Sequence, residues 1–300
     1  MKPSISNQKS KNHVAVLMAC YNRRELTLGC LATLAKQNDL NGQLEITVYL
    51  MDDASTDGTS KAVAEQYPEV RIIPGNGNLF WNRGMHLAFK EAMNGEYDFY
   101  LWLNDDTHLY QDAIKSLVSE YCQLSDTYGP STIVSGPTQD PDTGKFTYGG
   151  VIRHRTWHGW KFERVPPGEK TREIHATNGN CVLIPSNVAE QAGNLDPIYK
   201  HRWGDHDYCF RAIAKGCSIW MLSDYIGTCR WNSTEGTWKD TRVPMLKRYK
   251  LLSAPSGLMP ADYWVYVKRH RGWVWFLYWL APFVQIFLSS VGVRYFAHRK

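Results

Sequence analysis

The chain has 300 residues and a mass of 34.5 kDa, which is enough for one large domain or two small ones with a buried core. Apolar residues make up 43% and charged residues 21% of the sequence, so an intrinsically disordered or collagen-like chain is excluded. The formal net charge is +5 and the pI is near 8.7, which suits an anionic small molecule, a lipid surface or a nucleic acid.

Cysteine usage and the N-terminus both bear on the cellular compartment. The seven cysteines include no Cys-x-x-Cys pair, so neither a zinc ribbon nor a disulfide framework is indicated and reduced thiols are expected. Residues 1–13 lack the apolar stretch of a secretory signal. These features predict a cytoplasmic protein.

The first half of the chain alternates strand and helix patterns. Mainly apolar runs predict strands over residues 14–19, 45–51, 70–73 and 98–103, and the first of them, which contains β-branched residues, has the pattern of a strand buried on both faces. Apolar residues at helical spacing predict helices between and before them, over residues 23–37, 59–67 and 85–93. This alternation predicts an α/β fold with a parallel, doubly wound sheet.

The second half is less regular. Two further segments have the character of strands, over residues 133–136 and 146–152, and residues 181–184 form an apolar run after a polar Asn-Gly-Asn segment. Residues 154–170 are rich in Trp, His, Arg and Pro, and we expect them to form a long loop. Residues 205–215 are expected to form a short helix that ends before Gly216.

Polar residues follow three of the predicted strands directly. They are Tyr21-Asn22, Asp52-Asp53 and Asn104-Asp105-Asp106. Because ligands of parallel α/β sheets bind beyond the carboxyl ends of the strands, we expect the three clusters to meet at one edge of the sheet. This edge is the candidate active site.

The adjacent carboxylates of Asp105 and Asp106 have two possible roles. Two acidic side chains on one tight turn repel each other, and a bound Mg²⁺ or Mn²⁺ relieves this repulsion while bridging the carboxylates to phosphates. Alternatively, Asp106 caps a helix that begins near Tyr110. The residues alone leave both interpretations open.

Three other positions are candidates for ligand contact. Asp53 at a strand end can accept a hydrogen bond from a base or a ribose. Arg83 belongs to a polar loop that leads into a helix, where phosphate is attracted. Asp205 stands near a helix start beside aromatic residues, where it could act as a general base. The alternative for that last segment is a capped helix with a surface pair between Asp207 and Arg211.

Five motifs, in this order, resemble those of family 2 glycosyltransferases of the GT-A fold. Within residues 12–235 they read VAVLMACYNRRELT, MDDASTDGT, GNGNLFWNRGM, WLNDDT and WGDHDYCFR. The resemblance implies an inverting hexosyl- or deoxyhexosyltransferase that moves a sugar from a nucleotide diphosphate to an acceptor hydroxyl. Uridine diphosphate is the favoured carrier and thymidine diphosphate the alternative. The implied acceptor is a lipid-linked or growing bacterial surface polysaccharide, and no nucleic acid partner is expected.

The resemblance also implies roles for individual residues. The positions that match nucleotide-sugar contacts are Ala19, Tyr21, Asp53, Arg83 and Asp105. Among them, Tyr21 matches the residue that stacks on the base and Asp105 the residue that binds the ribose. Asp106 matches the ligand of Mn²⁺ or Mg²⁺, and Asp205 matches the catalytic base.

Two departures from the family pattern bear on the metal. Asn104 stands where many relatives carry Asp, which leaves Asp106 as the main expected ligand. Residues 228–232 contain no His, although many relatives place a metal-binding His there. Arg230 in this segment is a candidate replacement for part of the charge of the metal.

Residues 273–293 form an apolar stretch without any charged residue, flanked on both sides by Lys and Arg. The stretch is long enough to span a bilayer. However, basic flanks on both sides, the crowding of Trp and Tyr, and Pro282 favour an interfacial helix on the inner face of the cell membrane. A buried core helix or an oligomer face is the alternative.

These patterns predict a GT-A catalytic domain over residues 12–238 and a membrane-associating helical region over residues 239–300. The catalytic domain divides into a nucleotide-sugar-binding half, residues 12–110, and an acceptor-binding half, residues 111–238. Two other function classes are a metal-dependent nucleotidyltransferase and a non-catalytic sugar-nucleotide-binding assembly protein. The first should carry a Gly-rich, basic signature after the first strand, which residues 19–22 lack. The second is disfavoured because the acidic residues of the motifs are all present.

Overall fold

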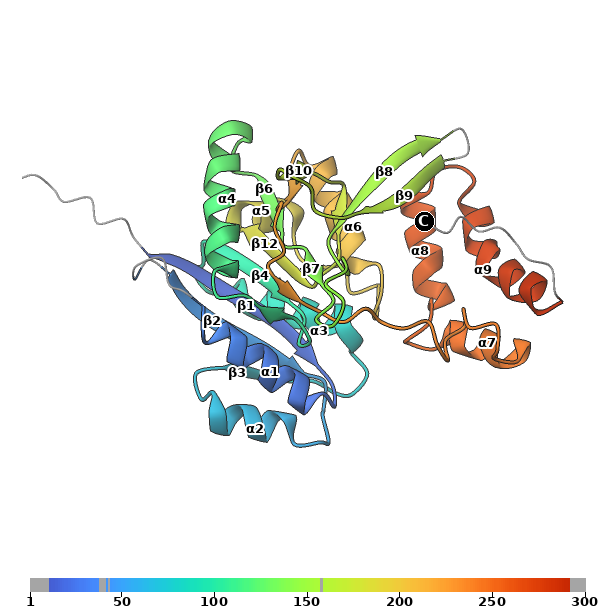
Figure 1. Cartoon of the computed structure of the whole chain (residues 1–300), viewed down its shortest axis with the longest axis horizontal. Helices are drawn as coiled ribbons and strands as arrows, with labels where there is room; N and C mark the ends of the chain where they lie inside the picture. The colour runs from blue at the N-terminus through green and yellow to red at the C-terminus, as the bar shows by residue number, and fades with distance from the viewer. Residues whose placement is uncertain (1–10, 38–41, 43, 157–158, 292–300) are drawn as a thin grey trace, which may run out of the picture.

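The computed structural model describes residues 11–37, 42, 44–156 and 159–291, and its centre is a large sheet with helices on both faces (Figure 1). The sheet has eight strands in the order β10-β13-β6-β12-β4-β1-β2-β3. These strands are β1 (Asn12–Cys20), β2 (Leu44–Asp52), β3 (Arg71–Pro74), β4 (Phe99–Leu103), β6 (Thr132–Ser135), β10 (Arg172–Glu173), β12 (Cys181–Pro185) and β13 (Ser218–Met221).

The parallel sheet predicted for the first half is confirmed. β1 pairs in parallel with both β2 and β4, and β3 extends the parallel half beyond β2. In the second half, β12 runs antiparallel between β4 and β6, and β10 runs antiparallel to β13 at the edge. The complete sheet is therefore mixed, with its parallel half in the N-terminal part of the chain.

Helices cover both faces of the sheet, and the last three helices of the chain form a group beside it (Figure 1). They are α1 (Arg24–Leu34), α2 (Thr59–Gln66), α3 (Phe80–Ala92), α4 (Ala113–Tyr128), α5 (Ser186–Ala192), α6 (Gly204–Ala214), α7 (Met245–Ser253), α8 (Pro260–His270) and α9 (Trp275–Ser290). Alternate residues of β1 face the two layers: Ala15 and Leu17 face a core with residues of α3, α6 and α8, whereas Val14 and Val16 face a core with residues of α1 and α4. β1 is thus buried on both faces.

Two small sheets lie beside the large one. One contains β5 (His108–Leu109), β14 (Gly227–Thr228) and β7 (Thr138–Gln139), and the other contains β11 (Ala176–Thr177), β8 (Gly150–Thr156) and β9 (Gly159–Val165). The long loop expected over residues 154–170 is therefore wrong, because most of it is a β-hairpin. Trp160, Lys161, Phe162 and Glu163 alternate apolar and charged side chains, which is a strand pattern of period two.

Two helix starts also differ from the sequence-based expectation. α3 begins at Phe80, five residues before the expected start at residue 85. α4 begins at Ala113 after Asp112, so Asp106 does not cap it. The capping interpretation of Asp106 is thereby excluded, and its carboxylate is available for another role.

The C-terminal helices α7, α8 and α9 form a group at one end of the molecule, and the β8–β9 hairpin reaches toward them (Figure 1). Arg271, which follows α8, donates from Nη1 to the carbonyl of Trp160 at 2.6 Å. Tyr263, Tyr266 and Val267 of α8 are buried in the main core. A chain that ended at the predicted boundary, residue 238, would lose these contacts, so the predicted catalytic domain depends on α8.

Asp207 of α6 forms a buried charge network that joins α6 to α8. Its carboxylate accepts hydrogen bonds from Tyr199 Oη at 3.0 Å, Arg211 Nε at 2.8 Å and Arg269 Nη1 at 3.1 Å, and it contacts His270 Nε2 at 2.9 Å. Burial alone would raise the pKa of Asp207, but the hydrogen bonds from His270 and Arg211 outweigh burial and hold this pKa below its usual range.

Substituting Asp207→Asn should therefore destabilise the fold. The change removes the anion that Arg211 and Arg269 share, and among the described residues Arg269 keeps only its ion pair with Asp196. The loss of these charge-assisted hydrogen bonds should cost ~1.5–3 kcal/mol of unfolding free energy. Urea unfolding at pH 7 measures the loss. Because the folded-state pKa of Asp207 is lowered, its stabilising contribution is present above the usual Asp pKa and is lost as the pH falls below it, so the two proteins should converge on acidification.

The matched control is Asp126→Asn on the exposed surface of α4, which should stay within ~0.5 kcal/mol of the parent. Equal unfolding curves for Asp207→Asn and Asp126→Asn at pH 7 would contradict a stabilising network around Asp207.

No helix in the described part of the chain is long and apolar enough to cross a membrane. Within the predicted stretch over residues 273–293, α9 takes up Trp275–Ser290, which is 16 residues, and residues 292 and 293 lie outside the described part of the chain. Pro282 and Ile286 of α9 are buried, so one face of the helix packs on the protein. The interfacial helix expected from the sequence is compatible with this geometry.

Candidate active site

The clusters that follow β1, β2 and β4 meet in one cleft of about 680 Å³. The parallel pairing of these strands brings their carboxyl ends to the same edge of the sheet. Six of the seven residues predicted for the site line this cleft, namely Ala19, Tyr21, Asp53, Asp105, Asp106 and Asp205. The expectation that the strand-end clusters meet is confirmed.

Two arginines expected near the donor lie elsewhere. Arg83 Nε donates to the carbonyl of Pro197 at 2.8 Å, and Arg83 does not line the cleft. Arg230 is exposed and forms an ion pair with Asp142, and it does not line the cleft either. Neither residue supplies positive charge to the cleft in this structure.

Asp53 organises the polar loop that enters α3. Its Oδ1 accepts a hydrogen bond from Gly77 N at 2.7 Å, and its Oδ2 accepts from Leu79 N at 2.9 Å and Phe80 N at 3.0 Å. These bonds satisfy free backbone N–H groups at the start of the helix. A contact to a nucleotide base remains a prediction for Asp53, in addition to this structural role.

Asp105 and Asp106 share one cation, the guanidinium of Arg23. Arg23 Nη1 lies 2.9 Å from Asp105 Oδ1, and Nη2 lies 2.6 Å from Asp106 Oδ2. Burial raises the pKa of Asp105 to about 7, with Arg23 opposing and Asp106 adding to the rise. For Arg23, burial would lower the pKa, but the attraction of the two carboxylates outweighs it and raises the pKa above its usual value.

The donor set at these carboxylates fits a metal that binds together with a substrate. Asp105 Oδ2 is buried and has no hydrogen-bond partner among the described residues, so an acceptor oxygen is available. Cys229 Sγ lies 3.5 Å from Asp106 Oδ1. No group of three His, Cys, Asp or Glu in the described part of the chain could hold a metal ion. Mg²⁺ is commonly held by one or two carboxylates plus substrate phosphates and water, which is what these two residues offer.

Asp205 lies at the start of α6, opposite the backbone of residues 178–180 in the cleft wall. Its Oδ1 accepts from His206 N at 2.8 Å and its Oδ2 accepts from Gly179 N at 3.3 Å. Trp203, just before α6, has a φ of 78°, and such left-handed backbone at a non-glycine residue is typical of functional sites. Asp207 is fully buried and does not line the cleft, so Asp205 is the carboxylate of this helix that lines it.

Three residues that the sequence analysis did not single out line the cleft. Trp81 Nε1 donates to Asn104 Oδ1 at 2.7 Å, so the indole is fixed beside the acidic turn. Burial lowers the pKa of His201 to about 4, helped by Arg202, so its imidazole is neutral at pH 7. Arg23 is the third addition, and its place directly after Tyr21-Asn22 was the available signal for it.

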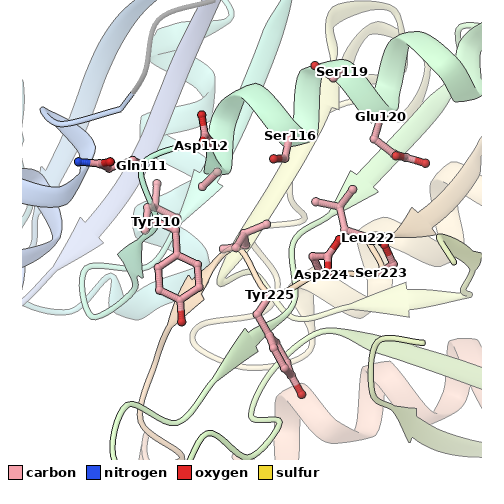
Figure 2. Close-up of a pocket in the computed structure, with 13 residues that line it drawn as sticks. Tyr110, Gln111, Asp112, Ser116, Ser119, Glu120, Leu222, Ser223, Asp224 and Tyr225 are labelled. Carbon is pink, nitrogen blue, oxygen red and sulfur yellow. Dashed lines mark hydrogen bonds between the residues drawn. The ribbon is translucent and has the colours of Figure 1, made fainter. Parts of the chain in front are cut away.

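A second hollow of about 760 Å³ lies outside this cleft, between the start of α4 and residues 222–226 (Figure 2). Asp112, Glu120 and Asp224 line it, and its lining contains no Lys or Arg. An anionic diphosphate would be repelled there. None of the residues predicted for the site lies in its wall, so the cleft beyond β1, β2 and β4 is the candidate active site.

Comparison with known proteins identifies the family. The model for glycosyl transferase family 2 matches residues 15–187, which is more than half of the chain, and the chain therefore belongs to this family. It is a glycosyltransferase, and the nucleotidyltransferase and non-catalytic interpretations are set aside. A curated relative from Mycobacterium tuberculosis, strain CDC 1551 / Oshkosh, is N-acetylglucosaminyl-diphospho-decaprenol L-rhamnosyltransferase. It is 23% identical over 277 residues, covering 83% of this chain and 82% of the relative.

Solved structures share the fold at low sequence identity. Residues 1–349 of TarS from S. aureus, in complex with UDP-GlcNAc, match at a TM-score of 0.54 and 15% identity over 93% of this chain and 73% of TarS. The mannosyltransferase PcManGT from Pyrobaculum calidifontis, in complex with GDP-Man and Mn²⁺, matches at 0.53 and 14% identity, over 95% and 72% of the respective chains. These likenesses confirm the GT-A fold expected from the sequence.

Gly204 precedes Asp205 at a point where no side chain fits. A Cβ atom at Gly204 would lie 1.6 Å from Asn82 Oδ1, and Asn82 is itself buried with its amide donating to the carbonyls of Asp196 and Tyr199. Gly204→Ala should therefore displace the start of α6 and Asp205 with it. Turnover of a glycosyl donor should fall by about 10²-fold, the usual scale for a misplacement of ~1 Å.

Initial rates of nucleoside diphosphate release measure this effect. Gly168→Ala is the control, because no atom lies within 4 Å of a Cβ at Gly168, and it should retain the parent rate. A Gly204→Ala protein with the parent rate would show that the position of Asp205 does not limit the reaction.

Proposed function

We propose that this enzyme is an inverting glycosyltransferase that moves a hexose or deoxyhexose from a nucleoside diphosphate to a lipid-linked acceptor. The observation that carries the proposal is the meeting of Asp105, Asp106 and Asp205 in one cleft. A metal-binding position and a candidate base in the same cleft are what such a transfer requires. The rhamnosyltransferase relative, whose name specifies a diphospho-decaprenol acceptor, supports a deoxyhexose and a lipid-linked acceptor.

The donor nucleotide is proposed to bind at the ends of β1, β2 and β4. Tyr21 is 52% exposed and lines the cleft, so its ring is free to stack on a base. Asp105 would accept a hydrogen bond from the ribose. The complexes of TarS with UDP-GlcNAc and of PcManGT with GDP-Man support a nucleoside diphosphate sugar as donor. We keep uridine diphosphate as the first carrier to test and thymidine diphosphate as the second.

Asp106, assisted by Asp105, is proposed to hold Mn²⁺ or Mg²⁺. When bound there, the ion would neutralise the charge that develops on the departing diphosphate. The Mn²⁺ in the PcManGT complex supports a divalent ion in a protein of this fold. Arg23 and Arg202 also line the cleft and add positive charge where the diphosphate would lie.

Asp205 is proposed to accept the proton of the acceptor hydroxyl. The backbone N–H groups of Gly179 and His206 orient its carboxylate. The deprotonated acceptor oxygen then forms a bond to the anomeric carbon as the bond from that carbon to the diphosphate oxygen breaks. Attack from the face opposite the leaving group inverts the configuration of the sugar.

Asp205→Asn should cut turnover by roughly 10²-fold or more, because a general base contributes on this scale, while donor binding stays near the parent value. Steady-state turnover and calorimetric binding of the nucleoside diphosphate measure the two effects separately. Asp224→Asn, outside the cleft, serves as the control. Parent-like turnover of Asp205→Asn would contradict the assignment of the base.

We propose further that α9 rests on the inner face of the cell membrane. Its outward side is an apolar stripe at helical spacing, which we call the α9 stripe. The stripe and its flanks consist of Trp273, Phe276, Leu277, Leu280, Val284, Phe287 and Val291. A solvent-facing helix surface normally carries polar residues, so a stripe of this length indicates a contact outside the chain.

Charge favours an anionic lipid surface as the occupant of the α9 stripe. The last 60 residues of the sequence contain ten Lys and Arg and one acidic residue, Asp262, whereas the first 240 contain 24 Lys and Arg and 28 Asp and Glu. The inner face of α9 is fixed to the protein, since Arg248 Nη1 donates to Ser289 Oγ at 2.9 Å and Trp279 Nε1 donates to the carbonyl of Pro260 at 3.1 Å. Basic flanks and an apolar face are the features of helices that lie in the membrane interface.

The full chain should therefore sediment with phosphatidylglycerol vesicles and much less with phosphatidylcholine vesicles, and high salt should reduce the binding. Leu280→Asp should weaken it by roughly tenfold or more, because burial of a Leu side chain contributes ~1.5–3 kcal/mol. Met93→Asp, at a position of comparable exposure, 36% against 46%, is the control. Parent protein that ignores anionic vesicles and dimerises through the stripe would contradict the membrane contact.

A further inference from the structure

Arg23 links the proposed nucleotide contacts to the proposed metal ligands. It directly follows Asn22, which has a left-handed φ of 50°, and it immediately precedes α1. The side chain crosses from the end of β1 to the turn after β4, where it contacts Asp105 and Asp106 with two different nitrogens. A planar guanidinium suits such two-point contact with carboxylates.

The backbone around Arg23 is held in place by the loop after β2. Asn22 N donates to Ser55 Oγ at 2.8 Å, and Arg24 N donates to Asp57 Oδ2 at 3.0 Å. These bonds fix the residue on each side of Arg23. The start of its side chain is therefore set by the fold, and the guanidinium can move only by rotation of the side chain.

Arg23 occupies one oxygen of each carboxylate at the proposed metal position, and the other oxygen of Asp105, Oδ2, is buried. Asp105 Oδ1 and Asp106 Oδ2 are both within 3 Å of the guanidinium. Asp105 is only 2% exposed, so a cation can reach its carboxylate only from the cleft side, where Arg23 lies. A divalent ion on the same two carboxylates would lie close to the guanidinium, and the repulsion between the two cations disfavours their binding together.

We propose that Arg23 is a built-in counter-ion that keeps free divalent ions off Asp105 and Asp106 until a nucleoside diphosphate enters the cleft. This inference rests on the proposed function, because it takes the two carboxylates as the metal position. A divalent ion that arrives without a nucleotide must displace the guanidinium of Arg23 from both carboxylates. It brings no anion with which the guanidinium could pair instead. An arriving diphosphate provides acceptor oxygens for the guanidinium, so the carboxylates are released and the metal enters together with the nucleotide.

Direct Mn²⁺ binding tests the inference without any turnover. Free Mn²⁺ is measured by electron paramagnetic resonance in the presence of the parent protein, with and without uridine diphosphate. The parent should bind Mn²⁺ weakly alone and much more tightly with the nucleotide. Arg23→Met should bind Mn²⁺ alone on the order of tenfold more tightly than the parent, because the competing charge is gone. A gain of affinity is a result that structural damage would not produce.

Arg24→Met is the matched control, because it removes the same charge one residue away. Among the described residues, the Arg24 side chain forms an ion pair only with Glu25, at 3.8 Å. Arg24→Met should therefore bind Mn²⁺ as the parent does. Arg23→Gln provides a second neutral variant should Arg23→Met fold poorly, and it should also bind Mn²⁺ alone more tightly.

Two outcomes would overturn the inference in distinguishable ways. If the parent binds Mn²⁺ with uridine diphosphate but neither Arg23 variant gains affinity for Mn²⁺ alone, Arg23 does not exclude the metal, and the proposed metal position stands. If no protein binds Mn²⁺ with either uridine or thymidine diphosphate, the metal position itself is wrong, and the role of Arg23 falls with it.

Discussion

The parallel pairing of β1 with both β2 and β4 is the constraint on which the site depends. Their register places Cys20 beside Asp52 and Leu17 beside Trp102, so all three strands end at the same edge of the sheet. Because β1 is buried on both faces, a slip by one residue would exchange its two sets of side chains between the layers. The hydrophobic core therefore fixes the register, and the register fixes where Asp53, Asp105 and Arg23 stand.

The same logic explains which features the sequence could predict. Strand ends after continuous apolar runs are local signals, so the amino-acid order alone is enough to place the clusters at Tyr21, Asp53 and Asp105 at one edge. Arg83 shows what the sequence could not predict. Its motif indicates a loop near the donor, but the direction in which its side chain points depends on a hydrogen bond to the carbonyl of Pro197, 114 residues away. The β9 strand was missed for a related reason. Its period-two alternation covers only residues 160–163, within a segment rich in Trp, His, Arg and Pro, and contacts that stabilise the hairpin, such as Arg153 over the ring of Trp160 at 4.2 Å, form only in the fold.

The C-terminal helices connect the segment that carries the proposed catalytic base with the proposed membrane contact. The inner side of α8 supports the segment that carries the base, since Lys200 N donates to Asp262 Oδ2 at 2.6 Å and the ring of Trp203 stacks on Tyr266 at 4.5 Å. α9 packs beside α8 and carries the α9 stripe on its outer side. A lipid-linked acceptor held at a membrane under α9 would thus approach a base whose position depends on the neighbouring helix. The aromatic residues of this region serve the core on one side and the proposed membrane contact on the other.

The acidic residues of the cleft differ in the groups that neutralise their charge, and this difference distinguishes their proposed roles. Asp53 accepts three backbone N–H groups, which leaves it a structural anchor with limited remaining capacity. Asp105 and Asp106 share the guanidinium of Arg23, which is the cation that we propose a divalent ion replaces. Asp205 accepts only two backbone N–H groups, one of them at 3.3 Å, and no cationic side chain of the described residues forms an ion pair with it. A carboxylate that is oriented by backbone N–H groups and forms no ion pair has lone pairs left to accept a hydrogen bond from a bound hydroxyl. Asp205 is therefore the acidic residue of the cleft that is best suited to take the proton from an acceptor hydroxyl.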